Sequence, residues 1–204
     1  MMNLSKTQLL GSLSLLVTVF FIVPWLIEVS GRWDFYFTLT SVALLATASA
    51  GVWLTFYIGR INIGQGAFAL IGAYTSAIMV VKGGWSFWPS LPAAGIFAAI
   101  VAVLIGLPIL RLRGVYFAMV TLVLTQVVTL TALALPITNG AKGISSIPLP
   151  AGVSIAGIVL IPDFSTLENT KLAFYYTACA IMVLTFAVLY RLVHSRLGHL
   201  CRSM

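Results

Sequence analysis

The feature that most constrains this chain is a succession of apolar runs, each long enough to cross a lipid bilayer. A spanning helix needs about 20 mostly apolar residues. Runs of about this length occur at residues 9–27, 36–58, 61–81, 91–110, 115–136 and 172–192. Only 7% of the residues are charged, whereas a soluble domain carries roughly 25%. The sequence therefore predicts an all-α, polytopic transmembrane helical bundle of about six spans, with residues 1–204 forming a single transmembrane domain.

Two of the apolar stretches leave alternatives open. The first run, 9–27, follows Lys6 as a signal peptide would, but its apolar core is longer than usual and no A-x-A site follows it, which favours a span. The stretch 153–161 is too short to span as a helix. We expect it in an external loop, as an interfacial element or a strand.

The basic residues predict the orientation of the spans. With the N-terminus inside, the inner side holds Lys6, Arg60, Arg111, Arg113, Arg191, Arg196 and Arg202. The outer side holds fewer basic residues and all of the acidic ones, namely Arg32, Lys82, Lys142, Lys171, Glu28, Asp34, Asp163 and Glu168. Because cytoplasmic loops carry an excess of Lys and Arg, both termini are predicted to face the cytoplasm. The net charge of +7 then reports topology and does not require a nucleic-acid partner.

Residues 61–76 read INIGQGAFALIGAYTS, and 64–69 fit the G-x-G-x-x-G/A pattern of dinucleotide-binding loops. That pattern needs a preceding strand and an acidic residue about 20 positions later to hold the ribose. Between Asp34 and Asp163 there is no acidic residue, and the stretch lies inside a run of spanning length. The sequence therefore excludes a nucleotide loop here.

Helical spacing gives the same stretch another interpretation. Small and polar residues recur at steps of three and four and would share one face, namely Asn62, Gln65, Gly66, Ala69, Gly72, Ala73, Ser76 and Ala77. One interpretation is a seam for close helix packing in lipid. The other is that the amides of Asn62 and Gln65 line a polar path, because amides that face lipid are costly. Gly64 and Gly66 also permit a broken or re-entrant helix near 61–66, where protein or water would have to cover it.

A second polar stripe is predicted in the span 115–136. Ala118, Thr121, Thr125, Thr129 and Ala132 form one face there, with Gln126 beside it. Threonine hydroxyls can bond the carbonyl one turn earlier, so this face suits packing as well as a polar path. Gln126 favours the path, because its amide has several groups to satisfy.

No acid, lysine or histidine lies inside the predicted spans. Proton-coupled carriers use such groups as relays. Their absence argues against a proton-driven carrier but leaves a sodium-driven one open. No catalytic constellation, zinc spacing or nucleophile elbow is present, so the sequence predicts no catalytic residue, metal ligand or cofactor.

Three stretches carry more specific motifs. Residues 59–68 and 71–75 read GRINIGQGAF and IGAYT, residues 110–122 read LRLRGVYFAMVTL, and residues 138–148 read TNGAKGISSIP. These resemble the signatures "G-x-L-S/N-L-G-H/Q-G-A-F … IGAYT", "LRLRGxYFAIVTL" and "TGGxDGLSGIP" of ABC transporter permeases for branched-chain amino acids. The first motif resembles the LivM-type subunit more than the LivH-type, whose stretch is closer to "INFAHG". The resemblance covers about residues 36–204, with Lys142 standing where the family has aspartate and Gln126 near a position often held by glutamate.

The resemblance implies a permease subunit in the bacterial inner membrane, forming a translocation path for branched-chain or related amino acids. Its partners would be a second, LivH-like permease, two cytoplasmic ATPase subunits that hydrolyse the ATP, and an external solute-binding protein. Relatives in the family carry urea, short amides or other amino acids, so these solutes stay open.

The C-terminal residues 195–204 resemble the start of the family's cytoplasmic coupling segment, "SxxGRALRAIRE", with His199 in place of an arginine. The resemblance makes Ser195, Arg196, Gly198 and Arg202 candidates for coupling to the ATPases. Family members usually continue beyond this point, so the chain resembles roughly the first two-thirds of a permease.

We expect a translocation path along the two polar stripes. Its candidate residues are Asn62, Gln65, Gly66, Tyr74, Thr121, Thr125 and Gln126. Two alternatives to an importer subunit stay open, a secondary carrier or channel for a small solute, and a truncated permease remnant that carries nothing.

Overall fold

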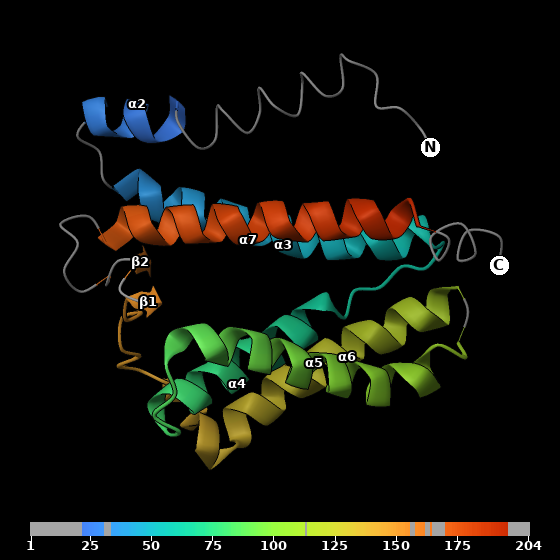
Figure 1. Cartoon of the computed structure of the whole chain (residues 1–204). Helices are drawn as coiled ribbons and strands as arrows, with labels where there is room; N and C mark the ends of the chain where they lie inside the picture. The colour runs from blue at the N-terminus through green and yellow to red at the C-terminus, as the bar shows by residue number, and fades with distance from the viewer. Residues whose placement is uncertain are drawn as a thin grey trace. The chain divides into compact units, whose positions relative to one another are not determined.

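The computed structural model describes residues 22–30, 34–112, 114–155, 158–161, 164 and 170–195, and most of these are helical (Figure 1). The helices are α2 (Val23–Ser30), α3 (Asp34–Tyr57), α4 (Gln65–Val81), α5 (Phe87–Ile109), α6 (Val115–Ala134) and α7 (Thr170–Val193). Two short 3-10 helices, η2 (Pro136–Thr138) and η3 (Gly140–Lys142), follow α6, and a hairpin of β1 (Val153–Ile155) and β2 (Ile158–Ile161) precedes α7. The prediction of a helical transmembrane bundle is confirmed.

Within the described residues, α3, α5, α6 and α7 are long and apolar enough to cross a membrane. They occupy the predicted spans 36–58, 91–110, 115–136 and 172–192 with small differences at their ends. The helix in the predicted span 61–81 begins only at Gln65 and has 17 residues, about 26 Å at 1.5 Å per residue. That is slightly less than the about 30 Å of a bilayer core. Most of the predicted span 9–27 lies outside the described residues.

Glycine and proline set the ends of the spanning helices. Gly114 precedes α6 with φ of 58° and ψ of −133°, a conformation open to glycine but strained for other residues. At the other end of α6, Leu135 is extended and Pro136 follows, which cannot continue the helix. The span 115–136 is therefore bounded by local backbone chemistry as well as by its apolar length.

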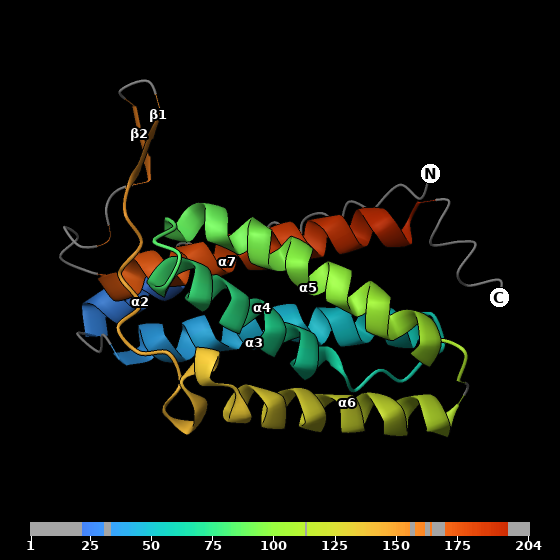
Figure 2. The same ribbon diagram turned by 90° about the horizontal axis from the view of Figure 1, so that it is seen from below.

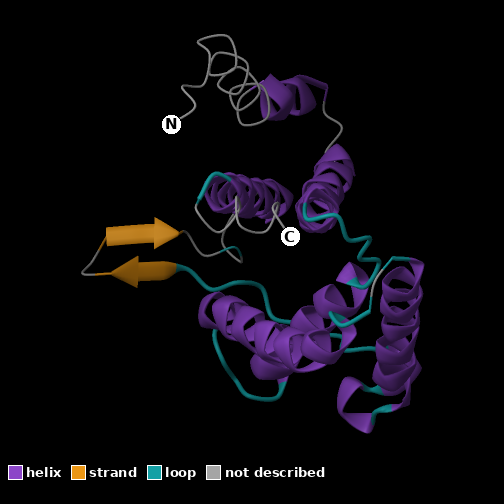
Figure 3. Ribbon diagram, turned by 90° about the vertical axis from the view of Figure 1, so that its right-hand side faces the viewer, coloured by secondary structure: helices purple, strands orange, loops and turns teal. Residues whose placement is uncertain are grey.

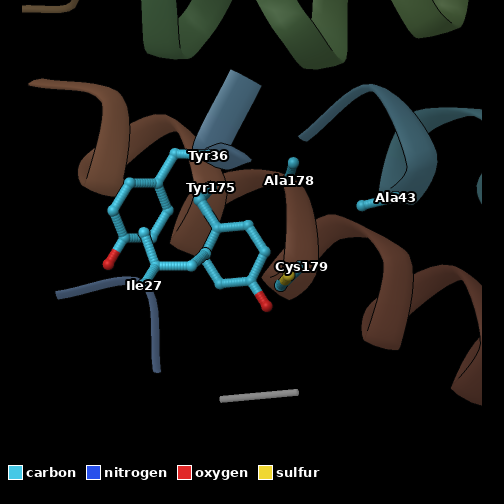
Figure 4. Packing of buried hydrophobic residues seen from close by; sticks show 6 residues of the cluster. All are labelled: Ile27, Tyr36, Ala43, Tyr175, Ala178 and Cys179. Carbon is cyan, nitrogen blue, oxygen red and sulfur yellow. The ribbon is translucent and has the colours of Figure 1, made fainter. Parts of the chain in front are cut away.

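The chain divides into two compact units, which we describe separately. The first comprises Met1–Thr47 and Glu168–Arg191, and so contains α2, the first part of α3 and most of α7. Its core joins Ile27, Tyr36, Ala43, Tyr175, Ala178 and Cys179 (Figure 4). The Tyr36 side chain is fully buried, and its hydroxyl donates to the carbonyl oxygen of Pro24 at 3.2 Å.

The second unit comprises Ala48–Leu167 and Leu192–Met204. Its centre is α4, which packs against both α5 and α6 (Figure 2). The antiparallel β1–β2 hairpin stands apart from these helices (Figure 3). Near its base, the Trp88 indole N–H donates to the Ala151 carbonyl at 2.8 Å, and Phe164 meets the Trp88 ring edge-on. Of the alternatives for residues 153–161, the strand is confirmed.

Candidate functional site

The segment that leads into α4 is held against α6 by hydrogen bonds between its backbone and threonine hydroxyls. Residues 61–63 lie outside any helix, and the Ile63 amide donates to the Thr121 hydroxyl at 3.2 Å. The Thr125 hydroxyl approaches the Ile63 carbonyl at 3.4 Å. Both threonine hydroxyls therefore provide hydrogen-bond partners for a stretch of backbone that has no helical partners of its own.

Glycine is needed where this segment meets α6. A Cβ at Gly64 would lie 3.3 Å from both the Cβ and the carbonyl oxygen of Thr121, and one at Gly66 would lie 3.3 Å from the Thr125 methyl carbon. Both distances are shorter than the about 3.5–4.0 Å of an ordinary carbon–carbon contact. The two glycines of the G-x-G pattern thus permit the α4 entry to approach the threonine face of α6.

Asn62 has a local role in this geometry. Its side-chain oxygen accepts the Gly64 amide at 2.8 Å, which closes a turn immediately before α4. The prediction that Asn62 shares a helical face with Gln65 is wrong, because the helix begins at Gln65. The side-chain oxygen of asparagine competes for backbone donors and so favours a turn over a further helical turn here.

Gln65 lies against α3 rather than α6. A Cβ placed on Gly51 of α3 would lie 3.1 Å from the Gln65 amide nitrogen and 3.2 Å from its oxygen. The Gln65 side chain is half-buried and makes no hydrogen bond with any other described residue. Its amide therefore packs closely against α3 at Gly51 while keeping hydrogen-bonding capacity to spare.

The threonines of α6 also bond their own helix. The hydroxyls of Thr121, Thr125 and Thr129 donate to the carbonyl oxygens of Ala118, Thr121 and Thr125 at 2.9, 3.2 and 2.8 Å. Thr121 is only 4% exposed. Gln126, by contrast, is exposed beside this face and has no hydrogen bond to a described residue. The structure therefore brings Asn62, Gly66, Thr121 and Thr125 together and turns Gln126 away from them.

The rest of the small-residue stripe on α4 faces α5. Ala69, Gly72, Ala73, Ser76 and Ala77 line a cavity of about 470 Å³ between these two helices. The hydroxyls of Ser76 and Ser90 lie 3.0 Å apart across the interface. The stripe therefore faces α5, as a packing seam between small side chains would.

A second cavity, of about 270 Å³, lies between α4, α6 and η2. Tyr74 is the one predicted path residue that lines this cavity. The other lining residues are mostly aliphatic, with three threonines among them. Within the described part of the chain, the Tyr74 hydroxyl has no hydrogen-bond partner. Tyr74 thus lies about two and a half turns along α4 from Gln65, in a different environment.

Arg60 was predicted only to mark the cytoplasmic side, and the structure shows that its side chain also makes specific contacts. One guanidinium nitrogen, Nη1, donates to the carbonyl oxygens of Leu110 and Leu112 at 2.9 and 3.2 Å. The guanidinium also lies 5.4 Å from the centre of the Phe117 ring. A cation beside the last carbonyls of a helix is favourable. The two carbonyls lie 50 and 52 positions along the chain from Arg60, so no local pattern could have indicated the contact.

Comparison with known proteins decides the family. A family model described as "Branched-chain amino acid transport system / permease component" matches residues 35–204. The chain belongs to this family. As one of its members with long apolar helices, it is a multi-pass membrane protein.

Two curated proteins of known name are similar to this chain. The "High-affinity branched-chain amino acid transport system permease protein LivM" of Escherichia coli (strain K12) is 36% identical over 153 residues. The protein of the same name from Salmonella typhimurium (strain LT2) is 35% identical over 153 residues. The aligned region is 69% of this chain but only 36% of each relative, so the chain matches about a third of their length. No solved structure is significantly similar to the chain.

The permease's candidate coupling residues lie at the edge of the described chain. Ser195 follows α7, and its hydroxyl donates to the Leu192 carbonyl at 2.6 Å. Arg196, Gly198 and Arg202 lie outside the described residues. The coupling role therefore stays a prediction from the sequence.

Proposed function

We propose that the chain is the permease subunit of an ABC importer for branched-chain or related apolar amino acids. In this proposal it forms the translocation path with a LivH-like second permease in the bacterial inner membrane. Two cytoplasmic ATPase subunits drive the cycle, and an external solute-binding protein delivers the amino acid.

The observation that carries the proposal is the family match over residues 35–204, together with relatives whose name states branched-chain amino acid transport. The helices add physical support, because their outward faces are strongly apolar. On α5, for example, Val103, Leu104 and Leu107 are 58%, 68% and 62% exposed. Such faces are stable only against lipid or against other membrane helices.

The proposal is tested by reconstituting the chain in liposomes with the partner permease, both ATPases and the binding protein, and measuring leucine uptake. We expect uptake that requires ATP and every partner. Uptake by this chain alone, unaffected by ATP, would identify a carrier or channel instead. A complete complex that hydrolyses ATP but takes up neither leucine nor valine would refute the proposed substrate class.

Within this function we infer that the polar side chains with spare hydrogen-bonding capacity line the path. Gln65 and Gln126 are the strongest candidates, because an amide facing lipid in a spanning helix is costly. Gln126 faces away from α4, so its amide would meet the path where the second permease approaches. We include Asn62, Gly66, Tyr74, Thr121 and Thr125 in the same candidate path.

Replacement by leucine tests this path. Gln65→Leu and Gln126→Leu are expected to lower the uptake rate of the complex by at least about tenfold, the effect of losing one good hydrogen bond to a solute. Leu122→Met, at an exposed position one turn before Gln126, is the matched control and should transport normally. Unchanged uptake in both glutamine variants would remove these residues from the path.

Residues 195–204 are proposed to couple the permease to the ATPases, with Ser195, Arg196, Gly198 and Arg202 as the contacts. Deleting this segment is expected to abolish co-purification of the ATPases while the chain still inserts into the membrane. Normal ATPase association after the deletion would contradict the coupling role.

The proposed orientation places both termini in the cytoplasm, on the side where Arg60 and Arg111 lie. Cysteines introduced one at a time at Ser5 and Ser203, with Cys201 replaced by serine and the buried Cys179 kept, should react with an impermeant maleimide only in inside-out vesicles. Cysteines introduced at Ser86 and Asn139 should react only from the opposite side. The reverse pattern would invert the topology.

A further inference from the structure

The cavity between α4, α6 and η2 combines an aliphatic wall with a cation at its rim. Leu70 and Ile78 line it from α4, Val128 and Leu135 from α6 and its end, and Ile137 from η2. Its volume of about 270 Å³ falls just below the about 300 Å³ at which pockets for drug-sized ligands begin. A cavity of this size suits a ligand no larger than an amino acid.

The polar atoms of the wall are mostly committed to their own backbone. The hydroxyls of Thr75, Thr131 and Thr138 donate to the carbonyl oxygens of Ile71, Val127 and Leu135, at 2.7, 2.8 and 2.7 Å. Their donor protons are therefore used, and the wall presents mainly carbon to an occupant. Tyr74 is the exception, because its hydroxyl has no partner among the described residues.

The cation at the rim is Lys82, the residue that follows α4. Its ammonium donates to the carbonyl oxygen of Ile137, a lining residue, at 2.7 Å. An ammonium has three donors, and this bond uses one of them. The Lys82 side chain is exposed, so its remaining donors can reach an anion at the cavity mouth.

We propose that this cavity is the site where the transported amino acid first binds, with its branched aliphatic side chain between α4 and α6 and its carboxylate at Lys82. The inference rests on the function proposed above and adds a place and a binding mode to it. Burial of the side chain supplies affinity in proportion to its apolar area, and the ammonium selects the carboxylate. Lys82 and η2 lie on the side that the proposed orientation makes external, where a binding protein would deliver the solute.

The larger cavity between α4 and α5 is a weaker candidate for the same ligand. Its serines, Ser76 and Ser90, are bonded to each other, and Ser90 also donates to the Phe87 carbonyl at 2.7 Å. None of the residues that line it is charged. It has an apolar surface but no group that would distinguish an amino acid from a lipid chain.

Site-directed labelling tests occupancy directly on the complex in nanodiscs. Ile137→Cys places a thiol at the rim, and its rate of reaction with a small maleimide should fall at least about threefold with saturating leucine. Leucinamide, which lacks the carboxylate, should protect much less. In the Lys82→Gln background leucine should protect no better than leucinamide, and Lys82→Arg should restore the difference.

A transport measurement tests the side-chain pocket separately. Ala132→Leu fills the cavity from α6 and should lower leucine uptake relative to alanine uptake by about tenfold, as expected for steric exclusion of a methylene or more. Leu133→Phe adds bulk at the next position, which is exposed and does not line the cavity, and should leave the ratio unchanged.

The outcomes separate this inference from the proposed function. If the parent complex fails to import leucine, the proposed function itself is wrong. If the parent imports leucine but the amino acid gives no protection at Ile137→Cys and Ala132→Leu keeps the normal ratio, the site is refuted. Protection that depends on anionic lipid instead of leucine would assign the cavity to a phospholipid and equally overturn the inference.

Discussion

Removing the Thr121 hydroxyl should loosen the entry to α4 without disturbing α6. Thr121→Val keeps the side-chain shape but leaves the Ile63 amide, 3.2 Å from the hydroxyl, without its acceptor. The lost intrahelical bond to Ala118 matters less, because that carbonyl belongs to the helix. The Thr121 side chain is only 4% exposed, and its hydrogen bond to the Ile63 amide is partly buried.

The expected cost is about 1–2 kcal/mol in the free energy of unfolding. An unsatisfied buried donor costs about 1–3 kcal/mol, while hydrogen bonds between side chains in membrane proteins have averaged about 0.6 and reached about 1.7 kcal/mol. The valine methyl adds a steric term, because a carbon in place of the oxygen would lie closer to the Ile63 nitrogen than the about 3.5–4.0 Å of an ordinary contact.

Thr129→Val is the matched control on the same helix. The Thr129 hydroxyl donates only to the Thr125 carbonyl, at 2.8 Å, so its loss should change stability by less than about 0.5 kcal/mol. Unfolding of the purified chain in mixed micelles gives both values. Hydrogen exchange at the Ile63 amide should also accelerate about tenfold in Thr121→Val, since 1.4 kcal/mol corresponds to that factor. Equal losses in the two variants, or unchanged exchange at Ile63, would falsify the argument that Thr121 anchors this backbone.

Three further predictions concern contacts away from Thr121. Gly51→Ala should not give the stability gain of about 1 kcal/mol that alanine usually brings to a helix, because the new Cβ would lie 3.1 Å from the Gln65 amide nitrogen. Adding Gln65→Ala should recover that gain in unfolding measurements. Additive effects of the two substitutions would contradict the contact. Arg60→Gln should cost about 1–2 kcal/mol by removing the guanidinium bonds to the carbonyls of Leu110 and Leu112, which follow α5. Equal stability of the two proteins would refute this. Asp34→Asn should leave the free energy of unfolding unchanged within error, because the Lys171–Asp34 pair lies at the surface with side chains 56% and 99% exposed. A clear loss of stability would show that the pair is shielded from water.

Much of the fold follows from apolar length and backbone chemistry. The spans around α3, α6 and α7 were predictable because runs of apolar residues have to become helices wherever lipid surrounds them. Gly114 and Pro136 mark the ends of α6 as the local rules require. The start of α4 was not predictable from length, because Asn62 is a polar residue within an otherwise apolar run and uses its side chain to close a turn.

The candidate site was only partly predictable, because sequence patterns report local geometry and not which distant segments meet. Helical spacing indicates which residues share a face, and it correctly grouped Ala69, Gly72 and Ser76 against a neighbouring helix. It does not indicate which helix that neighbour is. The contacts of Arg60 with Leu110 and of Lys82 with Ile137 span 50 and 55 positions, and they depend on how loops meet in three dimensions.

The path candidates differ in what remains of their hydrogen-bonding capacity, and this difference separates structural from transport roles. Asn62 and Thr121 already satisfy backbone groups of the α4 entry, so their replacement should lower stability first and transport only as a consequence. Gln65, Tyr74 and Gln126 make no hydrogen bond to another described residue. In a membrane, polar groups of this kind are retained only where water, a solute or another chain can reach them. Their replacement by apolar residues should therefore reduce transport while leaving the stability of the chain unchanged or raised.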